Sequence, residues 1–171
     1  MQKLNQRGVT LLETILVLSL ISIIMISGLN LYQNASESSK TNEAIREITS
    51  LSTQVRALYA SASDYEDITM EIVESAGAVP KGMKVDSSGN AYNTFNGKVS
   101  VEATENSATG ASDAWFNIVY NDVPKGACYK IVTSDVGAEE INGEASPLNP
   151  ADAADACQDS NNNTITFSFG N

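Results

Sequence analysis

The chain contains no histidine and only two cysteines among its 171 residues. Histidine is the commonest general base and metal ligand in proteins, so its absence excludes Ser-His-Asp and Cys-His nucleophile systems. The two cysteines, Cys128 and Cys157, are too few for a structural zinc site with its usual four ligands. In an exported chain an isolated pair predicts one disulfide. We therefore expect no catalytic residues, no cofactor and no metal.

Positive charge is also scarce, because ten lysines and arginines stand against 21 acidic residues and give a formal charge of −11. Such a surface repels phosphate backbones, so we expect no nucleic acid partner for the folded domain. Asp152, Asp155 and Asp159 gather near the C-terminus, but their spacing matches no familiar calcium-binding loop and lacks its glycine. We interpret them as a solvated helix face and loop.

The sequence has one long hydrophobic run at residues 9–31, VTLLETILVLSLISIIMISGLNL. As a helix it would measure about 34 Å, enough to cross a bilayer core. Lys3 and Arg7 precede it, which predicts a cytoplasmic N-terminus. The run is too long for a cleaved secretory signal, and no small-x-small cleavage site follows it. Glu13 lies inside the run, where a carboxylate costs roughly 2.5–3.5 kcal/mol, so it is a candidate functional residue.

The segment from Arg7 to Glu13, RGVTLLE, resembles the signal motif of type IV pilins and related pseudopilins. The resemblance implies that a prepilin peptidase cuts between Gly8 and Val9, and that Val9 becomes the modified (methylated) N-terminal residue. It also implies that Glu13 neutralises the amino group of a neighbouring subunit during assembly. Two charges that are each costly in an apolar fibre core would then form one compensated pair.

The helical pattern continues beyond the apolar run. Apolar residues recur at intervals of three or four and no glycine or proline occurs in residues 29–76, so we expect one helix from about Val9 to Ala62. Its second half is apolar along one stripe only, which predicts that this half packs on a domain. A coiled-coil stalk fits residues 40–62 nearly as well, but it explains Glu13 less well. The stripe consists of Ile45, Ile48, Leu51, Val55, Leu58 and Ala62.

The rest of the chain contains strand patterns. Alternating or β-branched and aromatic residues predict strands at 98–104, at 114–121 and in the terminal NTITFSFGN, where Ile165, Phe167 and Phe169 alternate with polar residues. Residues 86–97 are rich in turn formers and predict a surface loop.

Three shorter helices are also expected. The first covers residues 64–77 and ends at Gly77; the second covers 124–136 with Gly137 as its stop; the third opens at Asn149-Pro150 as N-cap and first residue. The apolar faces expected for the first two are Ile68, Ile72 and Ala76, and Ala127, Cys128, Ile131 and Val132.

The C-terminal half resembles type IVb pilins, such as the toxin-coregulated, bundle-forming and conjugative thin-pilus subunits. The segments that carry this likeness are NTFNGKVSV, PKGACYKIVTSDVG, NPADAADAC and the terminal TFSFGN. It implies an α+β fold, in which a long N-terminal helix with an apolar first half packs on an antiparallel sheet, with one C-terminal disulfide. The domains are then a leader (1–8), a transmembrane and fibre-core half-helix (9–31) and a globular head (32–171).

The function implied is that of a structural pilus subunit, assembled into extracellular fibres for adhesion, aggregation or conjugation. Its partners would be identical subunits, the prepilin peptidase and an inner-membrane assembly platform. The precursor would cross the inner membrane once with its C-terminus in the periplasm, and residues 137–149 with the cysteine-bounded region would be exposed on the fibre. A type II secretion pseudopilin, or a signal-anchored periplasmic enzyme or binding protein, are the alternatives.

Overall fold

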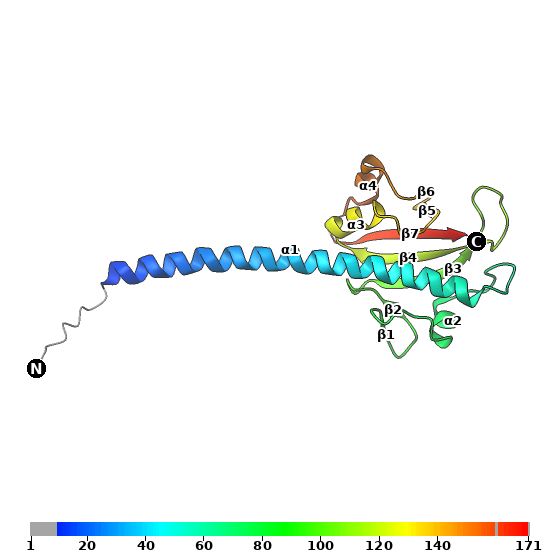
Figure 1. Cartoon of the computed structure of the whole chain (residues 1–171), viewed down its shortest axis with the longest axis horizontal. Helices are drawn as coiled ribbons and strands as arrows, with labels where there is room; N and C mark the ends of the chain where they lie inside the picture. The colour runs from blue at the N-terminus through cyan, green and yellow to red at the C-terminus, as the bar shows by residue number, and fades with distance from the viewer. Residues whose placement is uncertain (1–9, 160, 171) are drawn as a thin grey trace, which may run out of the picture. The chain divides into compact units, whose positions relative to one another are not determined.

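The computed structural model describes residues 10–159 and 161–170, and for residues 27–31 and 34 it describes the backbone alone. The chain divides into two compact units, Met1–Glu37 and Ser38–Asn171. The described part of the first unit is helical from Leu11 onward, whereas the second unit combines helices with a sheet (Figure 1). The predicted α+β fold, with a long N-terminal helix and an antiparallel sheet, is confirmed.

Among the described elements, the long helix and a small helix come first and four strands follow; two further short helices then alternate with the remaining strands, and a strand comes last. The elements are α1 (Leu11–Leu58), α2 (Met70–Ser75), β1 (Lys84–Val85), β2 (Ala91–Tyr92), β3 (Lys98–Thr104), β4 (Trp115–Val123), α3 (Lys125–Val132), β5 (Glu140–Ile141), β6 (Glu144–Ala145), α4 (Pro150–Ala156) and β7 (Asn163–Gly170).

Within the described residues seven strands form one antiparallel sheet in the order β1-β2-β3-β4-β7-β5-β6. The predicted strands at 98–104, 114–121 and the C-terminus are β3, β4 and β7, and they form the centre of the sheet. Phe116 lies opposite Phe169 and Ile118 opposite Phe167, and all four side chains are fully buried. The last strand of the chain therefore supplies the middle of the core rather than an edge.

The second half of α1 lies along one face of this sheet (Figure 1). Ile48, Leu51 and Val55 are completely buried in the common core, as the stripe predicts. Each such side chain contributes roughly 1.5–3 kcal/mol by leaving water. The prediction is wrong for Leu58 and Ala62, because both side chains are exposed.

The long helix ends at Leu58, four residues before the predicted end. Beyond it the chain turns back so that Tyr65 can enter the core, where its side chain is 1% exposed and its amide donates to the carbonyl of Asp113 at 2.8 Å. The Tyr65 ring packs on that of Phe116 with centroids 4.7 Å apart. Residues 58–65 contain no glycine or proline. We therefore attribute the end of the helix to the tertiary contact of Tyr65.

The helix predicted at 64–77 is only Met70–Ser75. Thr69 is its N-cap and accepts a hydrogen bond from the amide of Ile72, while Gly77 follows with a positive φ of 69°. Because the helix begins six residues late, its inner face differs: Met70 and Val73 are buried, and Ile72, predicted to lie inside, is 39% exposed.

The predicted surface loop at 86–97 contains structure that the pattern does not reveal. β1 and β2 pair as a small hairpin, and Asn93 is buried, with its Oδ1 accepting from the amide of Gly97 and its Nδ2 donating to the carbonyl of Asn121. A Cβ on Gly97 would lie 1.8 Å from that same carbonyl oxygen. The close approach of two backbones therefore requires glycine here.

The two C-terminal helices lie at the end of the sheet where β4 stops and β7 begins (Figure 1). The four predicted inward residues of α3, from Ala127 to Val132, are all buried, and Asn149-Pro150 caps and opens α4 as predicted. Two details differ. Pro124 is the N-cap of α3, and the helix ends at Val132 because the hydroxyls of Thr133 and Ser134 bond its last carbonyls, well before Gly137.

One arginine ties the long helix to the end of the last strand. Both Nε and Nη2 of Arg56 donate to the carbonyl oxygen of Gly170, at 3.1 and 2.9 Å. The guanidinium also lies 5.6 Å from the ring centroid of Phe169. A planar, permanently charged donor can make this fork, whereas lysine cannot.

Arg56→Leu is expected to lower the free energy of unfolding by about 1.5–3 kcal/mol, the usual worth of hydrogen bonds from a charged group. Urea unfolding of the full chain in detergent would measure this. Arg46→Leu on the same helix is the control, since the Arg46 side chain is exposed and has no hydrogen bond in the described residues; a loss as large there would contradict the role of Arg56.

Candidate functional site: the apolar helix and the head surface

The first part of α1 presents apolar side chains in every direction. In the described subunit twelve of them between Leu11 and Ile26 are exposed, from 42% at Ile21 to 79% at Leu11. A helix that is apolar all round is normally buried in lipid or in a large assembly. Within the described residues, however, no helix has both the length and the apolar character that a membrane crossing requires.

Glu13 lies in the first turn of α1, and its side chain is exposed. Its amide donates to both the carbonyl and the hydroxyl oxygen of Thr10, at 3.0 and 3.3 Å, so Thr10 closes the start of the helix. In the described residues the carboxylate has no hydrogen-bond or ion-pair partner. Gly8 and Val9, its predicted companions at the processing site, lie outside the described residues.

The disulfide is present as predicted. Cys128 on α3 and Cys157 at the end of α4 are bonded, with Cα atoms 5.8 Å apart and 29 residues apart in sequence, and both are fully buried. The amide of Leu148 also donates to the carbonyl of Val132. The bridge and this hydrogen bond hold α3 and α4 together and close the segment between them into a loop.

The predicted exposed surface at 137–149 has a mixed character. It carries the small hairpin β5–β6, in which Ile141 is fully buried, while Asn142, Gly143 and Glu144 at the tip are exposed. Of the acidic residues nearby, the carboxylate of Asp152 contacts the amide group of Asn149 at the helix cap. In residues 10–159 and 161–170 no group of three or more acidic or cysteine side chains is placed to hold a metal.

Two family models match the chain, and together they cover most of it. The model described as PilS N terminal matches residues 38–169, and the prokaryotic N-terminal methylation motif matches residues 3–29. The chain belongs to the PilS family of type IVb pilins. The methylation motif spans Gly8, Val9 and Glu13, whose individual roles remain predictions.

Curated relatives of this pilin are described as pilus subunits. Two proteins, from Escherichia coli O127:H6 (strain E2348/69 / EPEC) and Escherichia coli O111:H-, are each described as the major structural subunit of bundle-forming pilus. They are 26% and 25% identical to this chain over 190 aligned positions, which cover 98% of this chain and 96% of each relative. The likeness therefore extends over the whole pilin and not only over its N-terminal motif.

Solved structures show the same fold. The crystal structure of a type IVb pilin from Salmonella typhi matches with a TM-score of 0.58 and 21% identity, over 75% of this chain and 98% of that one. The structure of TcpA, a type IV pilin from Vibrio cholerae El Tor biotype, matches with a TM-score of 0.56 and 16% identity, over 76% and 98%.

Two charged residues that matter to the pilin head carry little signal in the sequence. Arg56 and Glu47 occupy helix positions where charged side chains normally face water, yet Arg56 binds the end of β7 and Glu47 is only 3% exposed. The one available clue to Glu47 is its place in the stripe: it immediately precedes Ile48, three residues after Ala44 and four before Leu51.

Proposed function

We propose that this pilin is the structural subunit of a type IVb pilus, a homopolymer assembled outside the cell for adhesion, aggregation or conjugation. The observation that carries the proposal is the apolar surface of residues 11–26, which the subunit itself leaves uncovered. Burial of apolar surface contributes roughly 25 cal/mol of free energy per Å². This surface is therefore strongly driven into lipid first and against identical helices afterwards. Both family matches and the bundle-forming relatives support this function.

The pathway we propose begins with a precursor that crosses the inner membrane once, with its C-terminus in the periplasm. Prepilin peptidase removes residues 1–8, which takes away Lys3 and Arg7 and makes the formal charge of −11 more negative by two. The assembly platform then extracts the subunit, so that residues 9–31 join the fibre core and residues 32–171 form the fibre surface. No catalysis is proposed for the head.

The pseudopilin alternative is not favoured, because the PilS model matches the head itself and not only the N-terminal motif shared by both groups. A signal-anchored periplasmic enzyme or binding protein is not favoured for the same reason. Electron microscopy of cells that express this chain as their only pilin, with antibody against the head, tests the proposal. Labelled surface fibres are expected, whereas short assemblies confined to the periplasm would overturn it.

Processing can be tested at the cleavage site. Gly8→Leu is expected to block leader removal and leave precursor in the membrane, because a bulky side chain beside the scissile bond prevents close approach of the peptidase. Gly8→Ala, a much smaller change, is expected to be cut. Mass spectrometry of the membrane fraction measures both; a wild-type chain with Met1 intact, or one cut near Ala35, would contradict the proposed site.

A further inference from the structure

Glu47 is a carboxylate inside the head. It lies on α1 and is 3% exposed. Its Oε2 accepts a hydrogen bond from the hydroxyl of Tyr120 on β4, and a longer one, 3.4 Å, from the amide of Thr94 in the turn between β2 and β3. Its Oε1 is buried and has no hydrogen-bond partner among the described residues. One oxygen is therefore satisfied and the other is not.

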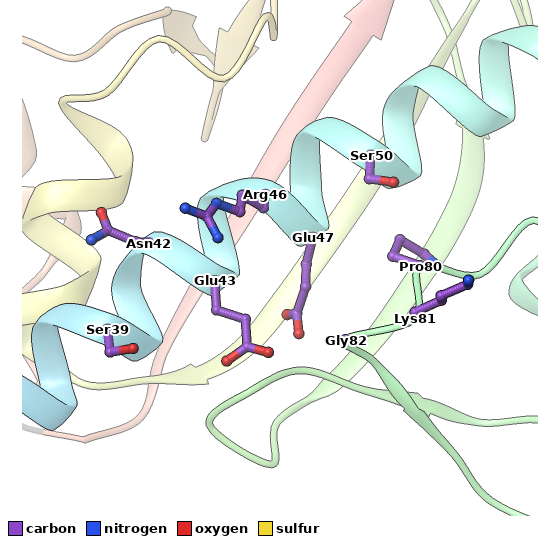
Figure 2. A pocket seen from close by; sticks show the side chains of 9 residues that line it. All are labelled: Ser39, Asn42, Glu43, Arg46, Glu47, Ser50, Pro80, Lys81 and Gly82. Atoms are coloured by element: carbon purple, nitrogen blue, oxygen red, sulfur yellow. The ribbon is translucent and has the colours of Figure 1, made fainter.

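The unpartnered oxygen lies beneath a loop at the edge of a groove. The groove, with a volume of about 540 Å³, runs between α1 and the loop Pro80–Gly82. A Cβ on Gly82 would lie 3.0 Å from Oε1 of Glu47, so the backbone of this loop covers the oxygen. Figure 2 shows the carboxylates of Glu43 and Glu47 leaving α1 on the same side, toward Gly82.

The charges around Glu47 do not compensate an ionised carboxylate. Glu43, one helical turn away, has the same sign. Arg46 and Lys81 also line the groove, but Figure 2 shows that both side chains point away from Glu47. On the sheet side the titratable neighbour is Tyr120, which donates its proton. Glu47 has no ion pair in the described part of the chain.

Burial is the main cause that raises the pKa of Glu47 above its ordinary value of 4.5, and the charge of Glu43 adds to it. The hydrogen bonds from Tyr120 and Thr94 act in the opposite direction without cancelling the rise. Burial and the nearby Glu47 also raise the pKa of Tyr120, so its hydroxyl stays protonated and remains a donor. The head thus binds a proton that the unfolded chain releases more readily.

We propose that Glu47 is a proton-operated latch, which holds the Pro80–Gly82 loop and the Thr94 turn against α1 while its carboxyl is protonated and loosens them when it ionises. A neutral carboxyl that is buried without a partner costs much less free energy than a buried carboxylate, so Oε1 can remain under Gly82 while the group is protonated. An ionised Oε1 without a donor is costly, and water is the donor at hand in the adjoining groove. Water reaches the oxygen only if the loop lifts.

The direction of the pH effect follows from the raised pKa. This contribution to stability is complete below pH 4.5, falls as the pH rises through the window between 4.5 and the folded-state pKa, and stays low above it. The latch therefore opens on going from acidic to alkaline conditions. Most acidic groups, whose folded-state pKa is lowered, produce the opposite trend.

Hydrogen exchange of the full chain in detergent micelles, followed peptide by peptide from pH 4 to 9, tests the latch. After correction for the intrinsic pH dependence of exchange, protection of residues 80–83 and 94–97 is expected to fall with rising pH, about tenfold for each unit of pKa rise. Peptides from β4 and β7 serve as the internal reference and should stay protected. Constant protection of both loops over this range would overturn the proposal.

Three substitutions sharpen the test. Glu47→Gln keeps the shape and cannot ionise, so both loops should stay protected up to pH 9. Tyr120→Phe removes a hydrogen bond that lowers the pKa, so the opening should move to higher pH. Glu43→Gln removes a charge that raises it, so the opening should move to lower pH even if Glu47→Gln folds poorly.

Three further results would overturn the latch. The first is a Glu43→Gln protein that opens at the same pH as the unmodified chain, and the second is a Glu47→Gln protein that still opens with rising pH. The third is recovery of loop protection at pH 8 on adding Ca²⁺ alone, lost in Glu47→Gln, because a metal ion rather than a proton would then occupy the site.

Discussion

Glu13→Leu is expected to abolish pilus assembly while synthesis, membrane insertion and leader removal continue normally. The substitution is expected to have opposite effects on two properties of the chain: it should improve membrane insertion and impair assembly. As a membrane helix the variant should insert better, because it no longer places a carboxylate, costing roughly 2.5–3.5 kcal/mol, in the apolar segment. As a pilus subunit it loses the proposed partner of a neighbour's Val9 amino group.

An uncompensated buried charge costs on the order of 3–5 kcal/mol for each broken pair, and every subunit of the fibre would bear that cost. The expected result is therefore few or no fibres by electron microscopy and by shearing, with cleaved subunit present in the membrane at the usual level. The structure supports a local effect, since the Glu13 side chain is exposed and has no partner in the described residues of its own subunit.

Thr14→Val is the matched control, because it replaces a neighbouring polar side chain by an apolar one of nearly equal size, and the Thr14 hydroxyl donates to the carbonyl of Leu11 in the same helix. Fibres are expected to form normally in this variant. If Glu13→Leu assembles at wild-type levels when it is the only pilin in the cell, the ion-pair mechanism of assembly is wrong.

Breaking the disulfide is expected to have the largest effect on the head itself. The bridge between Cys128 and Cys157 spans 29 residues, and the chain-entropy model assigns such a loop roughly 3–4 kcal/mol. That is a large share of the stability of an ordinary domain. Cys157→Ser should therefore lower the amount of subunit and the yield of fibres much more than it changes membrane insertion.

The single variants and the double variant should lose nearly the same free energy of unfolding, because each breaks the same bond. Urea unfolding in detergent measures this, and reducing the unmodified pilin should reproduce the loss. Cys157→Ala, which buries no hydroxyl, separates the bridge from the cost of a buried polar group. Free thiols titrated in native fibres would refute the bridge as a feature of the assembled protein.

Features that depend on one segment alone were predictable from the sequence. The continuous apolar run and the basic-glycine-glutamate motif at residues 7–13 are local patterns, and they predicted the N-terminal methylation motif that a family model matches at residues 3–29. The strands at 98–104 and 114–121, and the cap formed by Asn149, follow from alternation and from local capping chemistry. The disulfide was predictable because a chain with two cysteines allows one pairing.

Features that depend on distant partners were decided by the tertiary structure alone. α1 ends at Leu58 because Tyr65 must reach Phe116, and the turn at 93–97 is ordered because the backbone of Gly97 meets that of Asn121. Glu47 has the sequence appearance of a solvated helix residue, yet Tyr120 and Thr94, 73 and 47 residues away, enclose it. Periodicity records which face of an element is apolar, whereas the burial of a single polar group depends on which distant segments fold over it.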